Sequence, residues 1–360
     1  MNGLYIGSTR PCAGKTLVAL ALGQRFQREG RRVGFMKPVD VTPAGPGGRE
    51  GGRDGRFIRQ GLSLGDPLSL ITPVFLPRLD AGGARSCDLP EDRLPEIAEA
   101  YRRLSKAKDV MLVGGLGDFL HAGGGCGLAG PRVAKALGAR VMLIDRYHRG
   151  FQVERLLAAR EILGAGLVGV VLNDVPDEAR DEAEGLVAPF LESRGLPVLG
   201  VIAHDSFLAG IRVNELVQGL GGHLVASVTG RKRLVCTILI GAMRVENFMP
   251  RFRRVKDVAV LCSGDRSDLQ LLALEAGCAA LVLTGDFFPS ELVLTKAVEK
   301  DTPLLLLRQD MFAVAGAIEA VWGRARFQDR SRIAHAVRLV DRSLPPGAGN
   351  RDLGRGCSAA

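Results

Sequence analysis

The sequence predicts an α/β protein in which helices cover both faces of a parallel β-sheet and a smaller α/β domain follows. Three observations predict this fold class. The chain has 360 residues, more than the about 100–200 residues that one domain usually holds. Runs of almost wholly apolar residues alternate with helix-like segments, as is typical of strands buried in a parallel sheet. The alternation stops near residues 205–215 and then starts again, so we expect two domains.

The first domain is expected to span residues 1–210, and it opens with strand, loop, helix and strand. Residues 4–6 form an apolar run that predicts the first strand. After a loop, apolar residues recur at helical spacing over residues 17–26, until Gly30 ends the helix. An extended apolar run over residues 33–39 predicts the second strand.

The alternation of strands and helices continues through the rest of this domain. Residues 41–56 contain six glycines and two prolines without any period, which predicts an exposed loop. Beyond this loop, continuous apolar runs predict strands, and apolar residues three or four apart predict helices. The expected strands are residues 109–113, 141–144, 167–172 and 197–202, and the expected helices are residues 91–106, 131–137, 151–163 and 178–190.

The second domain is expected to span residues 212–325. The same patterns predict its elements. The expected strands are residues 234–240, 258–262, 280–284 and 304–307, and the expected helices are residues 267–275, 290–298 and 310–322. Residues 344–360 have no apolar period, and we expect them to be a disordered tail.

Composition excludes several classes of protein. Apolar residues make up 46% and charged residues 24% of the chain, which are ordinary values for a globular protein. No apolar run approaches the roughly 18 residues of a membrane-spanning helix, and no signal peptide is readable at the N-terminus. We therefore expect a cytoplasmic protein without a membrane partner.

Nucleic acid is not an expected partner either. Aromatic residues are only 5% of the chain, which disfavours a base-stacking surface. The net charge is +9, and residues 231–256 carry eight basic side chains against one acid. This stretch could attract a polyanion, but a solvated face is the favoured interpretation. The five histidines show no metal-ligand spacing, and no pair of cysteines has the CxxC spacing of a zinc site.

The segment from Gly7 to Thr16 carries the clearest chemical motif. Phosphate binding requires backbone N–H groups at a helix N-terminus, a lysine for the outer phosphates and a hydroxyl group for Mg²⁺. Gly14, Lys15 and Thr16 supply these groups between a predicted strand and a predicted helix. The upstream glycine is not at the spacing of the usual GxxxxGK[ST] motif. The alternative is a strand-to-helix turn with an accidental match, but the strand–loop–helix context favours a phosphate-binding loop. The expected nucleotide-binding residues of this loop are Gly7, Ser8, Thr9, Arg10, Ala13, Gly14, Lys15 and Thr16.

This loop, followed by Gly34-Phe-Met-Lys37-Pro-Val39, resembles the dethiobiotin synthetase-like group of P-loop proteins. The same group forms the N-terminal part of many bacterial phosphate acetyltransferases. The resemblance implies a P-loop NTPase-type fold with ATP and Mg²⁺ as ligands. It also implies that Lys37, as a catalytic residue, faces the substrate and the phosphates; the alternative is a solvated lysine before a proline. Thr16 and Asp40 are the expected metal ligands.

The chain departs from this group after the strand of residues 109–113. The group has a glutamate there that contacts Mg²⁺ and substrate, whereas this chain has Gly114. Asp118 is the candidate catalytic carboxylate in its place, and a solvated loop aspartate is the alternative. The resemblance also implies that Asn173 recognises the adenine edge, although it could equally be a turn residue. Asp145, at another strand end, is expected to be structural.

The second domain has a resemblance of its own. Gly264-Asp-Arg-Ser-Asp268, followed by Leu283-Thr-Gly-Asp286, is similar to the DRTGG domain, which often follows the first domain. These two turns would lie at the ends of adjacent parallel strands and form a small polar mouth. The alternative is a structural turn with Asp265 as the N-cap of the next helix. The resemblance implies no enzymatic activity for this domain.

The favoured function is ATP or nucleotide binding in a regulatory or sensing role, with at most slow hydrolysis. One alternative is an ATP-dependent, carboxylate-activating ligase of the dethiobiotin synthetase or cobyrinate amidation type. Another is a structural adaptor with a vestigial nucleotide site. Phosphate acetyltransferase activity is not expected, because in relatives with that activity the transferase domain follows the DRTGG region. We also expect a homodimer, because a small second domain buries proportionally less of its surface.

Overall fold

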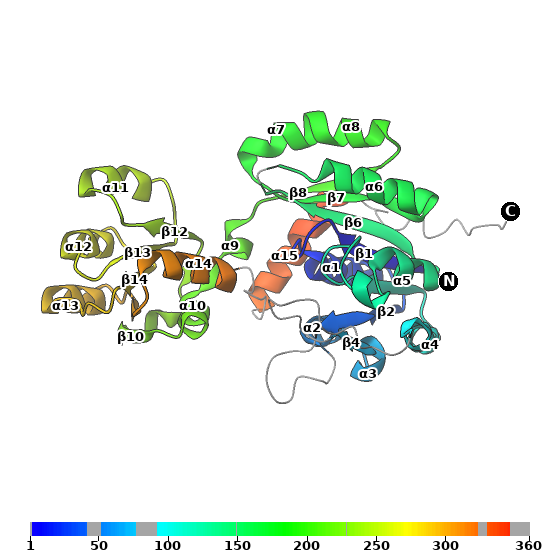
Figure 1. Cartoon of the computed structure of the whole chain (residues 1–360), viewed down its shortest axis with the longest axis horizontal. Helices are drawn as coiled ribbons and strands as arrows, with labels where there is room; N and C mark the ends of the chain where they lie inside the picture. Colours follow the sequence, from blue (N-terminus) through cyan, green and yellow to red (C-terminus); the bar gives the residue numbers. More distant parts are fainter. Residues whose placement is uncertain are drawn as a thin grey trace. The chain divides into compact units, whose positions relative to one another are not determined.

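The computed structural model describes residues 2–41, 52–76, 92–148, 150–227, 229–322 and 330–345. The chain divides into two compact units, which are coloured along the sequence in Figure 1. The first unit contains Met1–His204 and Ile333–Ala360, and the second contains Asp205–Arg332. The α/β fold class predicted from the sequence is confirmed in both units.

A six-stranded parallel sheet forms the centre of the first unit. Its strand order is β2-β5-β1-β6-β7-β8, so β1 lies between β5 and β6. Every residue of β2 and β5 is buried, as the apolar runs of the sequence predict for strands inside a parallel sheet. The strands are β1 (Asn2–Ser8), β2 (Val33–Met36), β5 (Val110–Gly114), β6 (Arg140–Arg146), β7 (Leu167–Val175) and β8 (Val198–Ala203).

Helices and two short strands complete this unit. Residues 53–56, which the sequence analysis placed in a loop, instead begin helix α2, and residues 42–51 of that expected loop lie outside the described residues. The small strands β3 (Val39–Val41) and β4 (Val74–Leu76) pair with each other in parallel. The helices are α1 (Lys15–Arg28), α2 (Arg53–Gly61), α3 (Leu68–Ile71), α4 (Leu94–Leu104), α5 (Gly130–Ala136), α6 (Val153–Leu163), α7 (Arg180–Glu182) and α8 (Ala188–Ser193).

The second unit is built on a five-stranded sheet with the order β10-β15-β14-β13-β12. All neighbouring strands are parallel except β10 and β15. The sheet strands are β10 (His223–Ala226), β12 (Thr237–Ile240), β13 (Val258–Ser263), β14 (Ala280–Thr284) and β15 (Leu304–Leu306), and β9 (Ile211–Arg212) pairs separately with β11 (Leu234–Val235). The helices are α9 (Ser206–Ala209), α10 (Val213–Leu220), α11 (Val245–Phe252), α12 (Ser267–Glu275), α13 (Glu291–Glu299) and α14 (Met311–Trp322).

A final helix, α15 (Arg330–Ser343), has no counterpart in the sequence analysis. Its side chains Val337 and Val340, together with the following Leu344, are buried in the core of the first unit. Leu344 and Pro345 are the first two residues of the expected disordered tail; residues 346–360 of that tail lie outside the described residues. The core of the first unit is therefore completed by residues that follow the second unit in the chain.

Candidate functional site

The loop of residues 9–14 crosses the carboxyl end of strand β1, between the ends of β5 and β6. Ligands bind at such strand ends in open α/β sheets. Ser8 ends β1 and Lys15 begins α1. Gly14 has a φ of 98°, and a Cβ at this position would lie 2.4 Å from Asn173 Nδ2. The turn into α1 therefore requires glycine both for its backbone conformation and for space.

Lys15 points back across the loop instead of into solvent. Its Nζ donates to Ser8 Oγ and to Gly117 O, both at 2.6 Å. Burial and, to a smaller extent, the positive charge of Lys37 lower the pKa of Lys15 to about 8, against the opposing effects of Asp54, Cys12 and Asp118. The ammonium group is held where its charge is poorly compensated.

Lys37 follows strand β2 and is only 4% exposed. Its Nζ donates to Gly115 O at 2.8 Å and lies 3.3 Å from Asp54 Oδ2. Lys15 at the start of α1 and Lys37 just after β2 thus both donate to carbonyl oxygens of the same short loop, residues 115–117. The solvated alternative for Lys37 is wrong, because its ammonium group is buried and faces the neighbourhood of Lys15.

The remaining loop residues are anchored by hydrogen bonds. Ser8 Oγ donates to Arg10 O at 2.7 Å. Thr9 Oγ1 donates to Asp145 Oδ1, and Asp145 Oδ2 accepts from the backbone N–H of Gln152 at 2.7 Å. Burial raises the pKa of Asp145. The expected structural position of Asp145 agrees with these contacts, since it ties the loop to the start of α6.

Two arginines that the sequence analysis did not single out also hold the loop. Arg155 Nη1 donates to Thr9 O at 2.8 Å, and Arg146 Nη1 donates to Cys12 O at 3.2 Å. Arg146 also pairs with Asp174 at 2.7 Å. The position of Arg146 at the carboxyl end of a predicted strand was a usable signal, whereas Arg155 lies within a helix pattern that gave none.

Gly114 ends strand β5 at the position where the resembled group has a glutamate. A Cβ there would lie 3.1 Å from Phe35 Cζ and 3.5 Å from Lys37 Cδ, so a side chain at this position would stand beside Lys37. Asp118 lies further along the loop. Its Oδ1 accepts from the backbone N–H groups of Leu120 and His121, each at 3.0 Å, so this carboxylate caps the following turn.

The other predicted ligands have contacts of their own. Asn173 Nδ2 donates to Ala13 O at 2.8 Å, which makes Asn173 a brace for the loop; its contact with adenine stays a prediction. Asp40 Oδ1 accepts from the N–H of Val41 at 2.9 Å, and Asp40 Oδ2 lies where a Cβ of Gly52 would be. Thr16 is half-buried in the first turn of α1.

Within the described ranges, no group of three or more histidine, cysteine, aspartate or glutamate side chains is arranged to hold a metal ion. None of the helices in those ranges is long and apolar enough to cross a membrane.

Comparisons with known proteins agree with this geometry. The family described as "AAA domain" matches residues 2–211, and the DRTGG domain matches residues 215–321. The chain is 22% identical to a phosphate acetyltransferase from Synechocystis over 95% of its length and 50% of the relative. It is 26% identical to the Pseudomonas putida phosphate acetyltransferase over 92% of its length and 49% of the relative. The chain thus spans about half the length of these relatives and matches their N-terminal half.

A third relative matches the first unit. The chain is 29% identical to the ATP-dependent dethiobiotin synthetase BioD of Rhodococcus jostii over 49% of this chain and 76% of the relative. Both resemblances stated from the sequence, to the dethiobiotin synthetase-like group and to the DRTGG domain, are therefore confirmed.

Proposed function

We propose that this chain, which belongs to the AAA domain family through residues 2–211, binds ATP at the loop of residues 8–16. The observation that carries the proposal is the convergence of Lys15 and Lys37 on the carbonyl oxygens of Gly117 and Gly115. Both ammonium groups are largely removed from water, and like charges that are close and desolvated destabilise each other. Asp54, 3.3 Å from Lys37 Nζ, compensates part of this charge, and a polyphosphate would supply the rest.

The loop also provides the other elements of a phosphate site. The first backbone N–H groups of α1 have no partner inside the helix, and the positive end of the helix dipole favours an anion. Gly14, just before α1, leaves the N-terminus of this helix free of a side chain. A Cβ at this position would lie 2.4 Å from Asn173 Nδ2. The triphosphate would replace the bonds from Lys15 to the neutral oxygens of Ser8 and Gly117 with stronger ones in which both partners are charged.

Mg²⁺ fits this site only as a companion of the nucleotide. Mg²⁺ retains several waters and is usually bound by one or two protein ligands together with phosphate oxygens. The Thr16 hydroxyl in the first turn of α1 is the first proposed protein ligand. The carboxylate of Asp40, in β3, is the second. The metal would offset phosphate charge, while Lys15 and Lys37 hold the phosphates in place.

Turnover of ATP is proposed to be slow, which favours a regulatory or sensing role. Rapid phosphoryl transfer requires groups aimed at the charge of the transition state. Gly114 stands where the resembled group has a glutamate, so Asp54 is the carboxylate that pairs with Lys37. Asp118 is engaged as a cap for residues 120 and 121.

Equilibrium binding and turnover assays on the purified full chain test this proposal. We expect ATP to bind in the presence of Mg²⁺, and hydrolysis to stay below about one turnover per second, the lower end of ordinary enzyme rates. Absence of ATP binding would contradict the proposed function. Brisk metal-dependent hydrolysis would favour an enzyme over a sensor.

A homodimer is part of the proposal. Phe287 and Phe288, after strand β14, are 55% and 65% exposed, and burial of such side chains in a second copy would stabilise the pair. Light scattering at micromolar concentration measures the mass. A value near the 38.3 kDa of one chain, with and without ATP, would exclude the dimer.

A further inference from the structure

The residues after the second unit are built into the first unit. Val337, Val340 and Leu344 lie in the same buried core cluster as the strands of the six-stranded sheet. The end of α15 also packs closely on β8, because a Cβ at Gly200 would lie 2.3 Å from Ser343 O. Helix α15 is therefore a component of the unit that holds the phosphate-binding loop.

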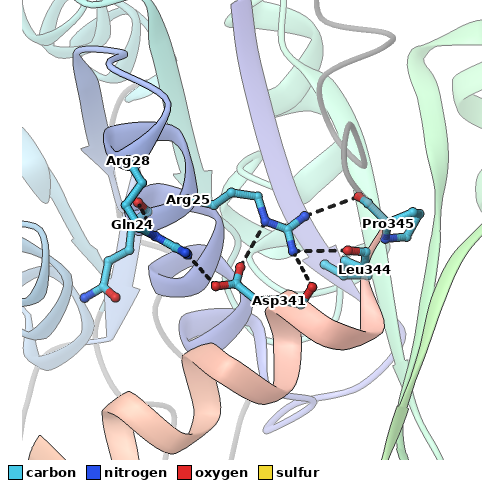
Figure 2. Close-up of polar contacts among 6 residues, drawn as sticks. All are labelled: Gln24, Arg25, Arg28, Asp341, Leu344 and Pro345. Carbon is cyan, nitrogen blue, oxygen red and sulfur yellow. Dashed lines mark hydrogen bonds and ion pairs between the residues drawn. The ribbon is translucent and has the colours of Figure 1, made fainter.

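An arginine of α1 holds the C-terminal end of α15, as Figure 2 shows. Arg25 Nε donates to Asp341 Oδ1 at 2.9 Å. Its Nη2 donates to Asp341 O at 2.9 Å and Leu344 O at 3.1 Å, and its Nη1 donates to Pro345 O at 3.3 Å. Arg28 adds a second contact to the Asp341 carboxylate. A cation at these carbonyl groups is favoured by the negative end of the helix dipole.

The pair is more than a surface ion pair. The side chain of Arg25 is only 12% exposed and that of Asp341 21% exposed. The planar guanidinium is used at once for a carboxylate and for three backbone carbonyl groups, which a lysine could not match. Arg25 belongs to α1, the helix that begins with Lys15, so the phosphate-binding lysine and this clamp share one helix.

The other end of α15 is fixed within the second unit. Arg332 is 4% exposed, and its Nη2 donates to Leu208 O at 2.7 Å and Gly210 O at 2.5 Å. The chain leaves the first unit at His204 and returns at Ile333. Arg332 thus ties the returning chain to the segment that leaves, and Asp341 follows nine positions later in the same helix.

From these contacts we infer that α15 couples the phosphate-binding loop to the second unit. The inference rests on the proposed function, because the signal begins when the phosphates of ATP move Lys15 from Ser8 and Gly117. A change at the first turn of α1 is carried by that helix to Arg25, from Arg25 to Asp341, and along α15 to Arg332. Coupling of this kind is reciprocal, so a ligand or partner of the second unit would change ATP affinity by the same factor.

Hydrogen–deuterium exchange on the full chain, with and without ATP, tests the inference. In the wild-type protein we expect ATP to slow exchange in residues 205–212 and 330–343 by about fivefold, the lower end of typical coupling between sites. Asp341→Asn should abolish this response and weaken ATP binding by a similar factor. The matched control is Asp109→Asn, which removes a different aspartate–arginine pair of the first unit, with Arg32 at 2.7 Å, and should leave the response unchanged.

The outcomes separate the two proposals. If the wild-type protein binds no ATP, the proposed function fails and the coupling fails with it. If ATP binds but residues 205–212 and 330–343 do not respond, or if they respond equally in Asp341→Asn, the coupling alone is wrong. Should Asp341→Asn lose its cooperative thermal transition, Arg25→Lys takes its place: it keeps the charge but loses the planar fork, and it is expected to reduce the response. An undiminished response in Arg25→Lys would overturn the inference.

Discussion

Each unit places glycine-containing turns at the carboxyl ends of adjacent parallel strands, but the charged side chains there are arranged differently. The first unit brings two lysines onto one loop, whereas the second pairs arginine with aspartate. In the first unit, Lys15 and Lys37 approach the loop of residues 115–117 from different elements. In the second unit, Arg266 turns to its exposed neighbour Asp268, with both bonds at 2.9 Å. A Cβ at Gly264 would lie 2.4 Å from Phe287 O. The second pair of turns therefore packs against itself.

The groups that donate hydrogen bonds to the turns also differ between the two units. Under the second pair, the buried amide of Gln270 donates to Ser263 O and Gly264 O, each at 3.0 Å, which closes the turn with neutral groups. In the first unit, the corresponding hydrogen bonds come from an ammonium group whose pKa is lowered to about 8. Strand-end glycines permit a binding site, but convergent and poorly compensated charge is what favours an anionic ligand.

Among the changes that test this difference between the units, Lys15→Ala is expected to reduce ATP affinity the most. The change removes a charge-assisted contact to phosphate, which is worth about 1.5–3 kcal/mol, or roughly a 10- to 150-fold loss of ATP affinity. Titration calorimetry measures it. The matched change in the other unit is Arg266→Ala, which should leave ATP affinity as it is. Equal losses in both variants would erase the distinction between the two regions.

Lys37→Met should have a smaller effect. Lys37 shares its charge with Asp54, so less of it is available to phosphate, and we expect about a tenfold loss of ATP affinity at pH 7. Because Lys37 lowers the pKa of Lys15, its removal should also raise that pKa. The affinity of Lys37→Met should then fall less steeply between pH 7 and pH 9 than that of the wild-type protein. An equally steep fall would show that the two ammonium groups do not interact.

The smallest effect on ATP binding is expected from replacing one glycine in each unit, Gly14 or Gly285, with alanine. Gly14 and Gly285 have φ values of 98° and 86°, so alanine at either position costs about 1–2 kcal/mol of backbone strain. Thermal unfolding should detect a destabilisation in both variants. Only Gly14→Ala is expected also to weaken ATP binding, since its new methyl group displaces Asn173 from the loop. A loss of ATP affinity in Gly285→Ala would contradict this division.

Much of the fold could be predicted because its signals are local. The apolar runs at residues 109–113 and 280–284 are found as β5 and β14, and the expected helix at residues 267–275 coincides with α12. Helix α15 was missed although Ile333, Val337, Val340 and Leu344 recur at helical spacing. What the spacing could not give is where this apolar face packs, because Arg25 and Gly200, which it meets, are remote in the sequence.

Individual residues of the candidate site could be predicted from the sequence, but the hydrogen bonds between them could not. The GKT motif identified Lys15, and the resemblance to the dethiobiotin synthetase-like group identified Lys37. Nothing local indicated that both would bind the loop of residues 115–117, or that Asn173 would donate to Ala13 O. The braces from Arg146 and Arg155 depend on the order of β1 and β6 in the sheet, which spacing along the chain does not give.

Proton uptake on ATP binding tests the central claim most directly. It is obtained at pH 8 by titration calorimetry in two phosphate-free buffers that differ in ionisation enthalpy. In the free protein Lys15 has a pKa of about 8, so it is about half protonated at this pH. Bound phosphate favours the charged form and raises the pKa, so binding should take up about half a proton. ATP affinity should then decline as the pH rises above 8. Binding without proton uptake, or with proton release, would contradict the claim that Lys15 meets the phosphates of ATP.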